Sequence, residues 1–119
     1  MKKFVKVVAI NVAGFLLSSG SVVAADMGSL TISSPQNSSI VTANTMLKLT
    51  YNVKLSPEGN HLHIYVDDQK PIVVRNVTGC PCTVDLPALS VGKHVILIDE
   101  ARADHSLTGI KSSIVITAK

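Results

Sequence analysis

The sequence predicts an all-β fold in which two antiparallel sheets pack face to face. Beyond residue 25, apolar residues alternate with polar ones instead of recurring every three or four positions, and β-branched residues predominate. Turn-forming residues interrupt this alternation about every 8 to 12 positions, which is the spacing of a β-sandwich. Helical periodicity is absent beyond residue 25. We therefore expect about seven short strands.

Each expected strand begins or ends near a turn signal. The Ser-Pro-Gln-Asn run at 34–37 closes the first strand, the Ser-Pro-Glu-Gly-Asn run at 56–60 closes the second, and 68–70 forms a tight link. Pro71 suits the first residue of a strand or an edge strand, because it donates no ladder hydrogen bond. The expected strands are 30–32, 46–53, 61–67, 71–77, 83–86, 93–101 and 110–117.

The first 25 residues have the three-part layout of a secretory signal peptide. Three lysines within the first six residues precede an apolar stretch at 7–17, and Val23-Ala24-Ala25 supplies a small-residue cleavage site. The apolar stretch is too short for a permanent membrane span, and no cysteine follows it that could carry a lipid. We expect a cleaved signal peptide at 1–25 and a single domain at 26–119, periplasmic or secreted, with no membrane anchor.

Removal of the leader changes the charge and the composition of the chain. The 11 basic residues include the three leader lysines, so the mature chain has 8 basic residues against 8 acidic ones. A near-neutral domain gives no support to a nucleic-acid partner. Both phenylalanines also lie in the leader, which leaves Tyr51 and Tyr65 as the aromatic residues. We expect an aliphatic core.

Several segments resemble small exported bacterial domains. The segments 32–41, with its Ser-Pro turn, and 89–97 resemble immunoglobulin-like or fibronectin type III-like domains. The His-x-His strand at 61–68, the Gly-Lys-His at 92–94 and the Ala-Asp-His at 103–105 are similar to small exported bacterial domains of largely unknown function. The resemblance implies a seven-stranded antiparallel immunoglobulin-like sandwich, and it implies a fold and a compartment more than an activity.

In an immunoglobulin-like strand order, one end of the sandwich collects metal-ligating side chains. His61 and His63 begin one strand on the same face, about 6.6 Å apart, where both can chelate one ion. His105 and the Cys80-Pro81-Cys82 loop are expected at the same end, with Asp99 and Glu100 on the neighbouring strand. The competing interpretation is that the His-x-His pair is the solvated face of an antiparallel sheet.

The two cysteines allow three interpretations. In an oxidising compartment Cys80 and Cys82 form a local disulfide across a very small loop. Alternatively they are a thiolate pair for Cu(I), or a redox-active dithiol. His94, at the start of its strand, is expected to have a structural role by hydrogen bonding back across the preceding loop.

Two functions follow from these features. The first is a non-catalytic binding or structural module that recognises a protein, or itself, through an exposed sheet face formed by Tyr65, Val95 and Leu97. In the expected strand 93–101, the residues of both faces are apolar. The alternation therefore leaves open whether Val95 and Leu97 face outward. No nucleophile elbow, phosphate loop or carboxylate pair supports an enzyme.

The second function is periplasmic metal binding, with copper favoured over zinc, through His61, His63, His105, Cys80 and Cys82. The segment 104–109 and the Ser-Pro turn resemble the copper-resistance C-type carriers. Those carriers use a histidine at the mature N-terminus, where this chain has Ala25, Asp26 and Met27. The resemblance therefore implies a metal-ligating role for His105 alone.

Overall fold

The computed structural model describes residues 27–119, so the predicted signal peptide lies outside the described residues. The described residues contain no helix long and apolar enough to cross a membrane. The strands are β1 (Ser29–Ser34), β2 (Ile40–Val41), β3 (Leu47–Lys54), β4 (His61–Val66), β5 (Ile72–Val74), β6 (Cys82–Leu86), β7 (Gly92–Ala101) and β8 (Leu107–Ala118).

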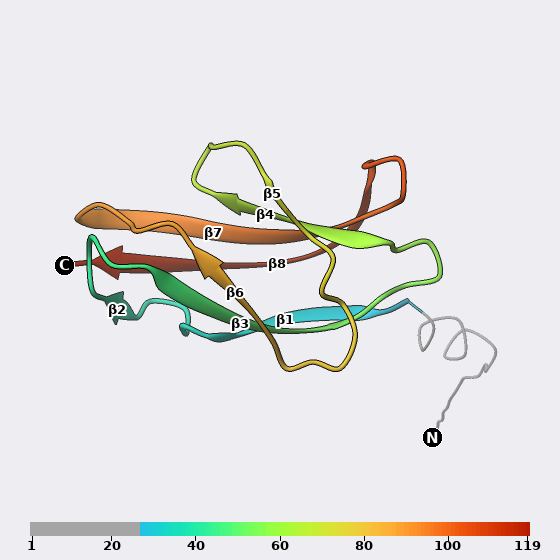
Figure 1. The fold of residues 1–119 in the computed structure, drawn as a ribbon, viewed down its shortest axis with the longest axis horizontal. Coiled ribbons are helices and arrows are strands. Elements are labelled where there is room, and N and C mark those ends of the chain that lie inside the picture. The colour runs from blue at the N-terminus through green and yellow to red at the C-terminus, as the bar shows by residue number, and fades with distance from the viewer. Residues whose placement is uncertain (1–26) are drawn as a thin grey trace, which may run out of the picture.

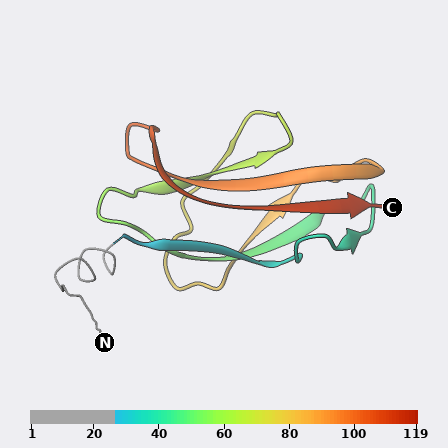
Figure 2. The ribbon, with the colours of Figure 1, turned by 180° about the vertical axis from the view of Figure 1, so that it is seen from behind.

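The strands form two sheets that pack face to face (Figure 1). One sheet has three strands in the order β1-β3-β6, and the other has five in the order β2-β8-β7-β4-β5. The reverse view in Figure 2 shows β1 and β3 in one layer and β7 and β8 in the other. The prediction of an all-β sandwich is confirmed.

The prediction of seven antiparallel strands is wrong in one respect, because the described residues contain an eighth strand. β2 has two residues and pairs with β8 in parallel, with Ile40 opposite Thr117 and Val41 opposite Ala118. Two residues are too few to produce a visible alternation. β5 is also shorter than predicted, with three residues instead of the expected run of 71–77.

The core between the sheets is aliphatic, as predicted, with one aromatic ring. The hydroxyl of the buried Tyr51 donates a hydrogen bond to the Asn76 carbonyl oxygen at 2.6 Å, so the one polar atom of that ring has a partner. Each fully buried Leu or Ile side chain contributes about 1.5–3 kcal/mol of transfer free energy. The fully buried aliphatic residues include Leu49, Leu62, Ile64, Leu86, Ile96, Ile98 and Ile116.

The two turns at one end of the sandwich lie together. The β3–β4 turn and the β7–β8 loop extend from the same end in Figure 1. The Asn60 backbone amide donates to the Ala101 carbonyl oxygen at 2.9 Å, and Arg102 Nε donates to Glu58 Oε1 at 2.6 Å. These contacts hold two loops that are more than 40 residues apart in sequence against each other.

A buried carboxylate ties the β3–β4 turn to the five-stranded sheet. Glu100 is fully buried and accepts hydrogen bonds from the Ser56 amide at 2.9 Å, the Ser56 hydroxyl at 2.6 Å and the Thr108 hydroxyl at 2.7 Å. A Cβ at Gly59 would lie 2.5 Å from Glu100 Oε2, so a larger residue there would have to displace the carboxylate from its donors. Three donors compensate the carboxylate for its lost hydration.

Candidate metal centre

Three histidines meet on the outer face of the five-stranded sheet. The two-residue period of β4 puts the imidazoles of His61 and His63 on one face, and the β7–β8 loop brings His105 over them. His61 Nε2, His63 Nε2 and His105 Nδ1 are each 3.1 Å from the other two. These three nitrogens form an equilateral triangle, which we call the histidine tripod.

The β7–β8 loop fixes His105 through its own hydrogen bonds. The Arg102 amide donates to the Ser106 carbonyl oxygen, and the His105 amide donates to the Arg102 carbonyl oxygen. Asp104 Oδ1 accepts from the Ser106 amide at 3.0 Å and the Ser106 hydroxyl at 2.6 Å. His105 itself has φ = 72°, in the left-handed region that few non-glycine residues adopt. The loop thus presents the third imidazole from a defined backbone position.

Hydrogen bonds on the far side of the rings determine which nitrogen carries a proton. Asn60 Oδ1 lies 2.8 Å from His61 Nδ1 and also accepts from Arg75 Nη1 at 3.2 Å. Because this oxygen only accepts, His61 carries its proton on Nδ1 and directs the Nε2 lone pair into the tripod. The Tyr65 hydroxyl lies 3.4 Å from His63 Nδ1.

Two of the three tripod histidines are buried, while His105 on the loop is exposed. His61 is 0% exposed and His63 is 6% exposed, so the interpretation of a solvated sheet face does not describe this pair. Burial, followed by the charges of Arg75 and the neighbouring imidazoles, lowers the pKa of His61. Burial and His105 also lower the pKa of His63. Neutral imidazoles with converging lone pairs repel one another unless a cation or a shared proton lies between them.

The spacing of the nitrogens fits a transition-metal ion. Three imidazole nitrogens arranged tetrahedrally at 2.0–2.1 Å from a zinc ion lie about 3.3 Å apart. The observed 3.1 Å triangle requires an expansion of only about 0.2 Å per edge. Within residues 27–119, His61, His63 and His105 form the one group of three or more potential metal ligands.

The structure does not bring the cysteines into this site. Cys80 and Cys82 are joined in a disulfide, with 4.3 Å between their Cα atoms, and neither belongs to the ligand group. The five-residue ligand set predicted from the sequence is therefore reduced to its three histidines. Of the predicted carboxylates, Asp99 lies opposite His63 in register, while Glu100 points into the sandwich.

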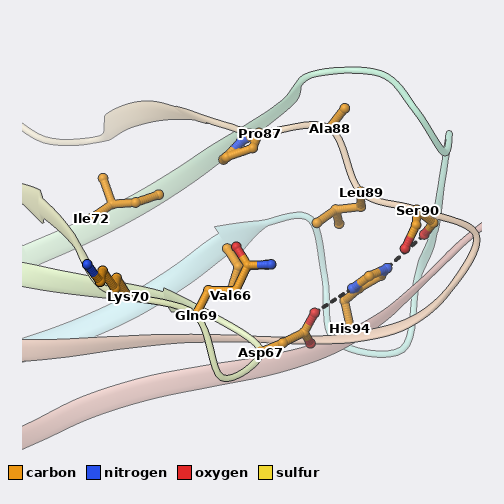
Figure 3. Close-up of a pocket in the computed structure, with 10 residues that line it drawn as sticks. All are labelled: Val66, Asp67, Gln69, Lys70, Ile72, Pro87, Ala88, Leu89, Ser90 and His94. Carbon is orange, nitrogen blue, oxygen red and sulfur yellow. Dashed lines mark hydrogen bonds and ion pairs between the residues drawn. The ribbon is translucent and has the colours of Figure 1, made fainter.

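His94 forms a different kind of site at the other end of β7. Its Nδ1 lies 2.7 Å from Asp67 Oδ2 and its Nε2 lies 2.7 Å from the Ser90 carbonyl oxygen (Figure 3). The predicted hydrogen bond back across the preceding loop is therefore present. Asp67 Oδ1 also accepts from the Val95 amide at 2.9 Å. We call this group the histidine clasp, and it borders a cavity of about 380 Å³.

Both ring nitrogens of His94 face oxygen acceptors, which favours the protonated ring. The carboxylate of Asp67, followed by the Ser90 carbonyl oxygen, raises the pKa of His94. Burial acts to raise the pKa of Asp67, but the hydrogen bonds from His94 and the Val95 amide outweigh it and lower that pKa. Both pKa shifts favour an ion pair between His94 and Asp67.

The predicted interaction residues lie on the same outer face as the tripod. Ile96 and Ile98 point into the core, so Val95 and Leu97 point outward, with Tyr65 opposite Leu97 and Val115 opposite Val95. Val95 is 46% exposed, while Tyr65 and Leu97 are partly buried. The sequence left open which face Val95 and Leu97 occupy, and the structure places them on the outer face.

Sequence reasoning missed the residues that support the tripod. Asn60 was part of a turn signal and Arg75 part of a strand, and nothing in their spacing relates them to His61. The contact arises because β5 pairs with β4 antiparallel, which carries the chain back towards Asn60. A polar residue directly before a His-x-His strand was the one available signal.

Comparison with known proteins identifies the fold alone. No protein-family model and no curated protein sequence matches this chain. A solved structure of Clostridium thermocellum CbhA fibronectin(III)-like modules is similar, with 20% sequence identity and a TM-score of 0.58. The match covers 76% of this chain and 94% of the module. The described domain therefore has a fibronectin type III-like fold.

Proposed function

We propose that this protein is an exported, non-catalytic binding module that holds a divalent transition-metal ion through His61, His63 and His105. The observation that carries the proposal is the triangle of ring nitrogens, 3.1 Å on each side. The Asn60 contact keeps the proton of His61 away from the triangle, and burial favours the neutral rings that metal binding requires. The predicted leader supports an exported location.

The donor set favours copper(II) first and zinc(II) second. Imidazole nitrogen suits both ions, and the general affinity order of divalent metals places copper above zinc. The disulfide takes Cys80 and Cys82 out of consideration as thiolates, which removes the sequence argument for a soft Cu(I) site. A site of three neutral nitrogens suits Cu(II) or Zn(II), whereas a site of thiolate sulfurs suits Cu(I).

A metal titration followed by NMR tests this function. The mature domain, residues 26–119, is titrated with Zn(II) while the imidazole signals are recorded. We expect the signals of His61, His63 and His105 to shift together and to saturate at one equivalent, while the signals of His94 stay in place. Cu(II) is compared by competition against a chromogenic chelator. Independent or unsaturable shifts would contradict a shared site.

A second candidate function is recognition of a protein through the outer sheet face. Val73 is 45% exposed, Val95 46% and Val115 39%, and together with Tyr65 and Leu97 they give this face an apolar character. The fibronectin type III-like fold is compatible with such a module. Sedimentation of the metal-free domain tests self-association, and a strictly monomeric protein over the micromolar range argues against it.

A further inference from the structure

The histidine tripod supplies three donors and leaves the coordination of an ion incomplete. A zinc ion bound by three protein ligands keeps a fourth position for water or for an outside ligand. Among residues 27–119, no other histidine, cysteine or carboxylate belongs to the ligand group. Glu100, the buried acid on the adjacent strand, is engaged by Ser56 and Thr108. An occupant of the open position therefore comes from outside the described domain.

The charge of the loaded site selects an anionic donor. Three neutral imidazoles leave the full charge of a divalent ion uncompensated, and Arg75 adds a further positive charge behind Asn60. Asp99 is the acid nearest in register, opposite His63, and it lies outside the ligand group. A carboxylate matches both the charge of the site and the preference of these metals for oxygen and nitrogen.

A depression on the same outer face lies beside His63, although none of the three tripod histidines lines it. It has a volume of about 390 Å³, and Tyr65, Leu97 and Leu107 contribute apolar surface to its lining. Tyr65 places it next to His63, because its hydroxyl lies 3.4 Å from His63 Nδ1, the ring nitrogen on the side away from the tripod, and Leu107 follows His105 by two residues. A hollow of this size accommodates a small organic molecule.

Three acidic residues in the lining of the depression add a specificity element. They are Asp67, Asp68 and Asp99. These acids repel a second negative charge on the occupant, so a monocarboxylate with an apolar body fits better than a dicarboxylate of the same length.

We propose that the metal-loaded protein binds a small monocarboxylic acid, whose carboxylate completes the coordination and whose apolar body lies on Tyr65 and Leu97. This inference rests on the proposed metal-binding function. In a simple apolar pocket, the apolar contacts supply the affinity. Here the metal ion supplies the affinity, and the depression supplies the discrimination between acids.

Cobalt(II) is a suitable probe, because its visible absorption reports both its binding and its coordination number. The Co(II)-loaded mature domain is titrated with 3-phenylpropionate, acetate and glutarate. We expect 3-phenylpropionate to change the spectrum with at least tenfold higher affinity than acetate, and glutarate to bind no better than acetate. Without Co(II), 3-phenylpropionate is expected not to bind.

A matched pair of variants locates the apolar body. Leu97→Asn lies in the depression, whereas Val115→Asn lies on the same face outside it. We expect Leu97→Asn to reduce the preference for 3-phenylpropionate over acetate at least threefold without changing Co(II) affinity, and Val115→Asn to keep the preference. If Leu97→Asn does not fold, the comparison of the three acids on the unaltered domain still decides.

The outcomes separate this inference from the function on which it rests. If the domain binds no Co(II), both the inference and the proposed metal-binding function are wrong. Co(II) binding with no spectral response to any carboxylate overturns the inference and leaves metal binding intact. Equal affinities for acetate and 3-phenylpropionate also overturn it. A metal-dependent dimer in sedimentation, in which a second copy fills the open position, overturns it as well.

Discussion

The histidine tripod and the histidine clasp use the same side chain for opposite purposes. In the tripod, three ring nitrogens face one another, and the proton of His61 is held on the far side by Asn60. In the clasp, both nitrogens of His94 face oxygen atoms, one from Asp67 and one from Ser90. Ring nitrogens that face one another need a cation or a shared proton between them, whereas a ring whose nitrogens both face oxygen acceptors favours the protonated form. The partners of an imidazole, and not its sequence motif, therefore decide its role.

The largest expected effect is on metal affinity. His63→Ala removes one of three donors, so we expect it to weaken Zn(II) binding by more than about 100-fold, beyond the loss typical of a supporting residue. His94→Ala is the matched control and should change the affinity by less than about twofold, because distant sites act independently. Calorimetric or competition titration measures both. Equal losses in the two variants would contradict the division of roles.

A smaller loss of affinity is expected from the supporting residue Asn60. Asn60→Leu removes the acceptor that keeps the proton of His61 on Nδ1 and orients the ring, so both the tautomer and the position of the Nε2 donor lose their support. We expect a loss of about 10- to 100-fold. The control is Asn60→Asp, which retains the acceptor and should preserve the affinity within about threefold. A Leu variant that binds as tightly as the unaltered domain would show that Asn60 has no orienting role.

The clasp is expected to contribute to stability and not to metal binding. His94→Ala removes two hydrogen bonds, one of them to a carboxylate that is partly exposed, so we expect a loss of about 1–2 kcal/mol in the free energy of unfolding. Urea denaturation of the metal-free domain measures it. His105→Asn is the comparison, since Asn tolerates the left-handed backbone at that position, and it should change stability by less than about 0.5 kcal/mol.

The smallest effect, and the sharpest distinction between the two sites, is the direction of the pH dependence. The pKa of His94 is raised above 6.5, so its stabilisation is fully present below about pH 6.5 and is lost as the pH rises through the folded-state pKa. The pKa values of His61 and His63 are lowered, so the metal-free domain loses stability at the tripod as the pH falls below about 6.5.

Denaturation of the metal-free domain between pH 5 and pH 9 tests these signs. The stability difference between the unaltered domain and His94→Ala should shrink towards pH 9, by less than about 1 kcal/mol because the pair is partly exposed. The acid limit of the clasp comes from Asp67, whose pKa is lowered below 3.8, so its contribution persists until the pH falls below about 4. A difference that grows with pH would contradict a protonated His94.

The fold was predictable because alternation and turn residues are local signals. Leu47, Leu49 and Tyr51 alternate with polar residues. In the structure they lie on β3, where Leu49 and Tyr51 are fully buried. β2 was not predictable, because its two residues acquire strand geometry only from pairing with the far end of the chain. A parallel contact between residues 40 and 117 leaves no local trace.

The candidate site was predictable in part. The His-x-His motif gives two same-face imidazoles from the strand period alone, and a sandwich topology brings His105 to that end. The predicted participation of Cys80 and Cys82 rested on the same topology, but the structure pairs them in a disulfide, and neither belongs to the ligand group. Strand topology determines where a loop residue lies less closely than the strand period determines which face a strand residue occupies.

The sequence by itself determined the strand class, the aliphatic core and the shared face of His61 and His63, because these depend on periodicity and composition. Only the tertiary structure decided that His105 completes a triangle, that Asn60 and Arg75 orient it, and that Leu97 points outward. Those outcomes depend on which strands become neighbours and on where the β7–β8 loop lies, and the contacts that report them join residues 15 to 44 positions apart in the sequence. Local patterns carry no information about such distant contacts.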